Sequence, residues 1–110
     1  MAYDEALADR IREFLANESG LEEKQMFGGL AFLVDGNMAV AASGQGGLLA
    51  RVDPAESDEL FETTPAEEME MRGRRMRGWL RLDSTDVADD ALAEWVERCL
   101  AYARSLPPKR

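Results

Sequence analysis

The residues best suited to chemistry are arginines gathered in one short segment. Between Met71 and Arg81 the chain carries five of them: Arg72, Arg74, Arg75, Arg77 and Arg81. A guanidinium group donates paired hydrogen bonds to a carboxylate or a phosphate. Trp79 lies within the same segment, and tryptophan and arginine are enriched at the residues that contribute most binding energy in protein interfaces. The segment is therefore a candidate binding surface.

Strand periodicity adds a further arginine to this group. If Leu80 and Leu82 face the core, Trp79 and Arg81 face away from it, and the same alternation along residues 48–52 turns Arg51 outward. We therefore predict a partner surface on the open face of a sheet, made of Arg51, Arg72, Arg74, Arg75, Arg77, Trp79 and Arg81. The alternative is that Trp79 is covered by its own chain and that the arginines pair with Glu68 and Glu70.

The other reactive groups are interpreted as structural. The chain has no histidine, which removes the usual general base and the commonest transition-metal ligand. Cys99 falls on the apolar side of a helical segment, so we expect it to be buried and unreactive. The aspartates at 83, 86, 89 and 90 lack the glycine and terminal glutamate of a calcium loop and are better explained by helix capping and interaction with the helix dipole. The sequence thus predicts no catalytic residue, no cofactor and no metal, and a protein that is not an enzyme.

Composition limits the partners. The chain has 110 residues, of which 22 are acidic and 13 basic, giving a formal net charge of −9. A chain this acidic repels a polyphosphate backbone, so we do not expect it to bind nucleic acid directly. Nucleic-acid binding through the arginine segment 72–81 remains the alternative, as does an uncharacterised small-ligand or enzymatic role. No segment is long enough to span a bilayer, and the acidic N-terminus is unlike a signal peptide, so we expect a cytoplasmic protein that does not associate with membranes.

Three segments with helical signals and several short apolar runs must position these residues. The length fits one domain over residues 1–110. Apolar residues recur at helical spacing over 4–18 and 88–105, and Asp53-Pro54 predicts a short helix over 54–61 with Leu60 and Phe61 turned inward. The residues expected to share one core are Phe14, Phe32, Leu92 and Trp95.

Strands are expected over residues 22–27, 30–34, 38–42 and 48–52. Asp35-Gly36 is typical of a two-residue hairpin turn in which both residues have positive φ. A second hairpin is expected from 69–72 and 78–82, with Arg74–Arg77 at its tip. The resulting order, α-β-β-β(-β)-α-β-β-α, predicts an α+β two-layer sandwich in which helices pack on one face of an antiparallel sheet.

Two blocks in these strands resemble the N-terminal domain of the TfoX (Sxy) family. They are Gln25–Phe32, with the sequence QMFGGLAF, and Asp35–Val40, with the sequence DGNMAV. The segments Leu48–Asp53, Gly73–Trp79 and Glu94–Val96 are also similar to small stand-alone members of this family. The resemblance implies a two-layer α+β domain with an antiparallel sheet. It further implies a bacterial regulator of transcription, of the kind that controls natural competence together with the cyclic-AMP receptor protein.

The residues and the resemblance together predict a non-enzymatic interaction domain that acts through a protein partner. Self-association as a homodimer is the alternative within the same class. The chain is expected to be a stand-alone member without the C-terminal domain of the full-length regulators.

Overall fold

The computed structural model of the chain describes residues 3–26, 28–44, 46–71 and 73–108. These residues form three α-helices and six strands in the predicted order α-β-β-β-β-α-β-β-α. The elements are α1 (Glu5–Leu15), β1 (Leu21–Met26), β2 (Gly29–Val34), β3 (Asn37–Ala42), β4 (Leu48–Arg51), α2 (Pro54–Thr63), β5 (Glu67–Met71), β6 (Arg74–Leu82) and α3 (Asp89–Ser105), with a 3₁₀ turn over Ser84–Asp86. No helix of the described part is long and apolar enough to cross a membrane.

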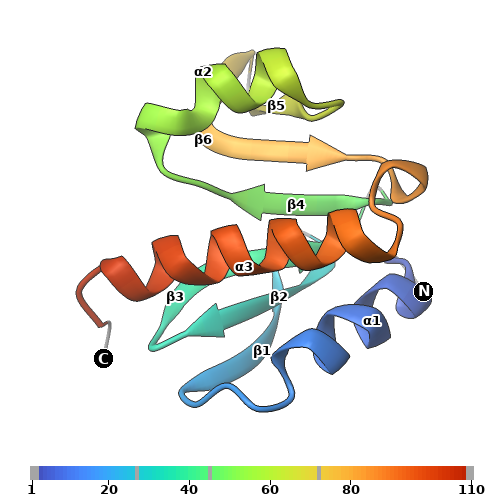
Figure 1. The fold of residues 1–110 in the computed structure, drawn as a ribbon, viewed down its shortest axis with the longest axis vertical. Helices are drawn as coiled ribbons and strands as arrows, with labels where there is room; N and C mark the ends of the chain where they lie inside the picture. Colours follow the sequence, from blue (N-terminus) through green and yellow to red (C-terminus); the bar gives the residue numbers. More distant parts are fainter. Residues whose placement is uncertain (1–2, 27, 45, 72, 109–110) are drawn as a thin grey trace.

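The six strands form one open antiparallel sheet. Their order across the sheet is β1-β2-β3-β4-β6-β5, so the second hairpin adds to the sheet through β6 and leaves β5 at the edge. In Figure 1 α3 lies across β3 and β4, with α1 beside it, while α2 lies next to β6. The architecture is therefore the predicted α+β fold.

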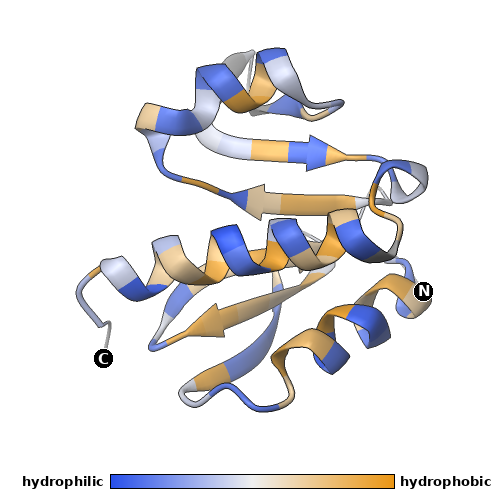
Figure 2. Cartoon of the chain, in the orientation of Figure 1, coloured by the Kyte–Doolittle hydropathy of each residue, from blue (hydrophilic) through white to orange (hydrophobic). Residues whose placement is uncertain are grey.

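The main core lies between this sheet and the helices. Its buried residues come from all three helices and include Phe32 of β2 and Leu92 and Trp95 of α3, as predicted. Figure 2 shows the pattern: β3 and β4 are apolar over most of their length, whereas α1 and α3 carry apolar and polar stripes. Because only one stripe of each helix meets the sheet, the polar stripe remains in solvent.

The prediction that Phe14 joins this core was wrong. Its side chain is 44% exposed, whereas Leu7, Ile11 and Leu15 are buried. Those three residues are spaced by four and form a single narrow stripe, and Phe14 lies on the flank of that stripe. The helix also ends at Leu15 rather than at residue 18, since Asn17 and the residues after it favour turns over helix.

The first hairpin turn forms as predicted. Asp35 and Gly36 have φ values of 52° and 84°, the left-handed pair that this turn requires. Gly29, in the block that resembles the family signature, is required for a different reason. A Cβ atom at this position would collide with the carbonyl oxygen of Ala42. The backbones of β2 and β3 therefore approach each other closely here because residue 29 has no side chain.

The tip of the second hairpin was placed wrongly. Residues 74–77 belong to β6, and Gly73, which has a φ of 77°, lies in the turn just before it. Charged side chains at the end of a hairpin tolerate a strand as readily as a loop, because water reaches both faces there. The run of arginines therefore does not indicate where the turn lies, whereas Gly73, with its left-handed backbone conformation, does.

The second helix confirms its predicted start and corrects its predicted packing. Asp53 caps α2 by accepting a 2.9 Å hydrogen bond from the backbone nitrogen of Ala55, and Pro54 opens the helix. Leu60 is buried as expected, but Phe61 is 42% exposed. The side chains of adjacent helical residues point about 100° apart. Because α2 is short and packs on β6 along one side, it buries Leu60 and leaves Phe61 in solvent.

Candidate functional site

A second apolar cluster lies on the sheet face opposite the main core. Its four buried residues are Ala31, Met38, Ala41 and Leu49, and three partly buried residues pack against them: Met26, Leu33 and Trp79. All seven are in strands, and the described helices contribute to the main core instead. We call these seven residues the second-face cluster. No described helix covers this face, although four of the seven residues are buried and only Met26, Leu33 and Trp79 of the cluster are partly accessible.

Local sequence and register explain why this face is apolar. The strands β2 and β3 read GLAFLV and NMAVAA, without the polar residue at every second position that a wet face would need. A β-bulge follows Phe32, where Leu33 pairs with Met38 and leaves Ala39 as an extra residue. Ala39 and Val40 can then both lie in the main core, while Met38 and Ala41 lie on the second face.

Arg51 borders the second-face cluster beside Trp79, which is a member of it. They are register partners across β4 and β6, and the guanidinium carbon of Arg51 lies 5.3 Å from the centroid of the Trp79 ring. Tyr102 of α3 approaches the same guanidinium from another side, at 5.7 Å from its ring centroid. Arg51 is thus held by two aromatic rings at the end of β4, a cation–π arrangement that fixes its position.

Trp79 itself is half-buried. Its own chain therefore covers it in part and leaves the rest accessible. Sequence reasoning missed the contribution of Tyr102. The signal was its spacing of seven residues from Trp95, which places both on one side of α3, but the contact also depends on how α3 crosses the end of β4.

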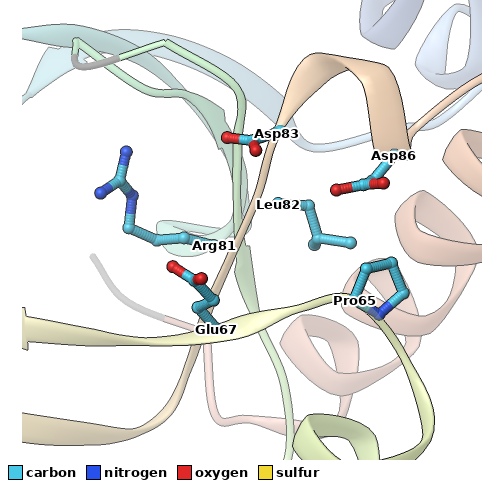
Figure 3. A pocket seen from close by; sticks show the side chains of 6 residues that line it. All are labelled: Pro65, Glu67, Arg81, Leu82, Asp83 and Asp86. Atoms are coloured by element: carbon cyan, nitrogen blue, oxygen red, sulfur yellow. The ribbon is translucent and has the colours of Figure 1, made fainter.

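Arg81 lies further along the same face, at the rim of a small polar pocket. The pocket has a volume of about 140 Å³ and is lined by Pro65, Glu67, Arg81, Leu82, Asp83 and Asp86. Figure 3 shows Arg81 and Glu67 on one side of β6 and Leu82 on the other. Glu67 is the register partner of Arg81, yet no ion pair joins the two side chains in the described structure.

Arg77 is separated from the other arginines. Its guanidinium donates to Asp58 at 2.9 Å and to the carbonyl oxygen of Pro54 at 3.2 Å, so it lies with α2. The cause is an irregularity in β6: Leu80 pairs with Glu68, but the next pair along is Met76 with Met69. The inserted residues break the alternation that would have placed Arg77 beside Trp79.

The remaining members of the predicted surface fall outside what the structure describes. Arg72 lies outside the described residues. Arg74 and Arg75 are strand residues opposite Met71 and Glu70, and the positions of their side chains are not described. The structure therefore brings together Arg51, Trp79 and Arg81 and places Arg77 elsewhere.

Cys99 lies in the main core. Its side chain is fully buried, and burial raises the pKa of the thiol to about 12, an effect that nearby Arg98 only partly opposes. A thiol in this state is protonated at neutral pH and is a poor nucleophile. Within the described residues, no group of three or more His, Cys, Asp or Glu side chains is arranged to hold a metal ion.

Comparison with known proteins gives one family. A model of the TfoX N-terminal domain matches residues 13–103 of the chain. The matched segment begins inside α1 and ends near the end of α3, so it includes the entire described sheet. No curated protein matches the chain.

Proposed function

Because the chain belongs to the TfoX N-terminal domain family, we propose that it is a non-enzymatic interaction domain that binds a protein partner on the second face of its sheet. The role is that of a bacterial transcription regulator of the competence type, exerted through this partner. The family match supports the regulatory part of this proposal, and the second-face cluster supports the location of the binding surface.

The observation that carries the proposal is the apolar character of the second face. An antiparallel sheet with helices on one side normally presents polar residues on the other. Here that face holds four buried apolar residues and, around them, the partly exposed Met26, Leu33 and Trp79. The accessible apolar side chains of this face are therefore Met26, Leu33 and Trp79, and apolar groups exposed together with charged residues at their rim support a protein-binding site.

The rim is formed by residues of three different strands. Glu22 and Lys24 of β1 are register partners of Leu33 and Ala31, which places them on the second face at one edge. Arg51 and Arg81 lie at the other side of the cluster. A half-buried tryptophan with neighbouring arginines matches the composition of residues that dominate binding energy in protein interfaces.

The test is to use the chain as bait in a lysate of the cells that make it. We expect a specific partner that is retained by the wild-type chain and lost by Leu33→Glu, which places a charge in the cluster. With the purified partner, Trp79→Ala should weaken binding by about 2 kcal/mol or more, as the loss of a central aromatic contact does.

The matched control is Phe61→Ser, because Phe61 is an exposed aromatic residue on α2, away from the second face. It should retain the partner as the wild-type chain does. A partner that is lost with Phe61→Ser but kept with Leu33→Glu and Trp79→Ala would place the interaction on the helical side and contradict the proposal.

A further inference from the structure

Arg51 and Arg81 have no carboxylate partner within the described structure, although the chain is rich in acidic groups. Acidic residues outnumber basic ones by 22 to 13. The other arginines near carboxylates form ion pairs at 2.8–2.9 Å: Arg12 with Asp9 and Glu23, Arg77 with Asp58, and Arg104 with Glu18. A shortage of carboxylates in the chain therefore does not explain why the guanidinium groups of Arg51 and Arg81 have no carboxylate partner.

The environment of Arg51 leaves its hydrogen-bond donors available. Trp79 and Tyr102 contact the guanidinium through their ring faces, at 5.3 and 5.7 Å from the ring centroids. Aromatic rings attract the positive charge but do not accept the in-plane N–H groups as a carboxylate would. The two rings thus orient a cation whose N–H groups remain to be bound by another molecule.

Register places the second cation close to the first. Arg51 pairs with Trp79 and Leu49 pairs with Arg81, so Arg51 and Arg81 are diagonal neighbours across β4 and β6. Such residues lie about 7–8 Å apart on one face of a sheet, and their Cβ atoms are somewhat closer. Two acidic residues one helical turn apart, or two residues apart in a strand, have a spacing that both arginines can reach. Leu49 lies between the two arginines and belongs to the second-face cluster.

From this arrangement, and resting on the proposed function, we infer that the partner of the second face is an acidic protein segment. Its apolar side chains contact the second-face cluster, and two of its carboxylates bind Arg51 and Arg81. Paired N–H donors on each guanidinium fit a carboxylate in the two-pronged geometry that makes such contacts specific.

A nucleic acid fits this surface less well. Glu22 lies on the same face beyond the apolar residues, Glu67 lies opposite Arg81, and the chain carries a net charge of −9. A phosphate backbone carries a charge at every nucleotide and would meet these carboxylates. A protein segment can place its acidic residues at the two arginines alone.

The test is a selection of short random peptides displayed on phage, with the whole chain as bait. Selected peptides should carry two acidic residues beside apolar ones. They should bind Arg51→Gln and Arg81→Gln at least about tenfold more weakly than wild type, and a peptide whose acids are replaced by amides should lose the same affinity. Arg98→Gln is the matched control. Arg98 also stacks on a ring, that of Trp95 at 4.8 Å, but it belongs to α3.

A charge exchange keeps the test independent of folding. Arg51→Gln also removes the stacking on Trp79, so the thermal midpoint of each variant is measured alongside binding. Arg81→Glu should bind a peptide with lysine at one acidic position more tightly than it binds the original peptide. A variant that had only lost its fold would bind neither peptide.

Three sets of outcomes overturn the inference in distinguishable ways. Peptides without acidic residues, or acidic ones insensitive to both arginine variants, overturn it; if Leu33→Glu still abolishes their binding, the proposed function stands. Peptides that bind regardless of Leu33→Glu, or no enrichment over a selection without bait, contradict both. Oligothymidylate binding that depends on Arg51 and Arg81, or a dimer of the chain that Leu33→Glu abolishes, assigns the face to another occupant and also overturns the inference.

Discussion

Phe32 and Phe14 show how the position of a residue on its helix or strand determines whether its side chain is buried. Phe32 in β2 is fully buried beneath the helices, whereas Phe14 in α1 is 44% exposed. Both residues are phenylalanine and both lie in elements that contact the main core. The difference is that Phe32 points directly between sheet and helices, while Phe14 lies on the flank of the apolar stripe of its helix.

The two residues form a matched pair for a stability measurement. Phe32→Ala should lower the free energy of unfolding by about 3–5 kcal/mol, because it removes a large buried side chain and leaves a cavity. Phe14→Ala should lower it by less than about 1 kcal/mol, as exposed substitutions do. Denaturant titration of both variants measures the difference, and equal losses would mean that the burial of these residues has been assigned wrongly.

Cys99 gives a prediction about reactivity and pH. The thiol should react with a disulfide reagent only after denaturation. Its pKa is raised from an ordinary value of 9.0 to about 12, so the unfolded chain loses this proton at lower pH than the folded chain does. The contribution to stability is therefore present below pH 9 and is lost as the pH rises toward 12.

Over this pH range, Cys99→Ala should show a shallower alkaline decline in unfolding free energy than the wild type, by up to about 1.4 kcal/mol per pH unit. Denaturant titrations of both chains at successive pH values give the two slopes. Rapid labelling of the native thiol, together with identical slopes, would show that Cys99 is accessible.

At the scale of elements, a small clamp joins α2 to β6. The buried hydroxyl of Ser57 accepts a 3.1 Å hydrogen bond from the backbone nitrogen of Gly78, at the irregularity of β6. Nearby, the carbonyl oxygen of Gly78 accepts a 2.8 Å hydrogen bond from the backbone nitrogen of Val52, just before α2. On the surface, Arg77 contacts Asp58 and Pro54. This clamp fixes the place in β6 from which Trp79 extends to the second face.

Ser57→Ala should therefore destabilise the chain by about 1–3 kcal/mol, since the buried N–H of Gly78 loses its acceptor. Asp58→Asn is the control from the same helix: its ion pair with Arg77 is exposed, and the loss should stay below about 1 kcal/mol. Thermal or denaturant unfolding measures both. A larger loss for Asp58→Asn than for Ser57→Ala would show that the surface pair, and not the buried hydrogen bond, holds the clamp.

At the scale of the whole molecule, local signals in the sequence are enough to predict the fold. Asp35-Gly36 specifies a turn and Asp53-Pro54 specifies a helix start, because each acts through its own backbone geometry. The alternation around Arg51, Trp79 and Arg81 likewise places these three residues on one face. Such features need no knowledge of distant parts of the chain.

The rest of the candidate site depends on contacts that the sequence does not encode locally. Arg77 leaves the group because β6 contains an irregularity at Gly78, which has a φ of 88°. A glycine inside a strand signals such an irregularity, but it does not show how many residues are inserted. Tyr102 reaches Arg51 only because α3 crosses the end of β4. The sequence predicts strands over residues 30–34 and 38–42, but one short apolar run cannot show that helices cover only one of its two faces.

The central claim is that a protein partner binds the second face of the sheet, and site-specific photo-cross-linking in the cells that make the protein tests it most directly. A benzophenone amino acid is placed at position 33, in the second-face cluster, or at position 61, an exposed site on α2. We predict that irradiation joins the position-33 chain to a second, different protein and that the position-61 chain gives no such product. A product at position 61 with none at position 33 would contradict the claim.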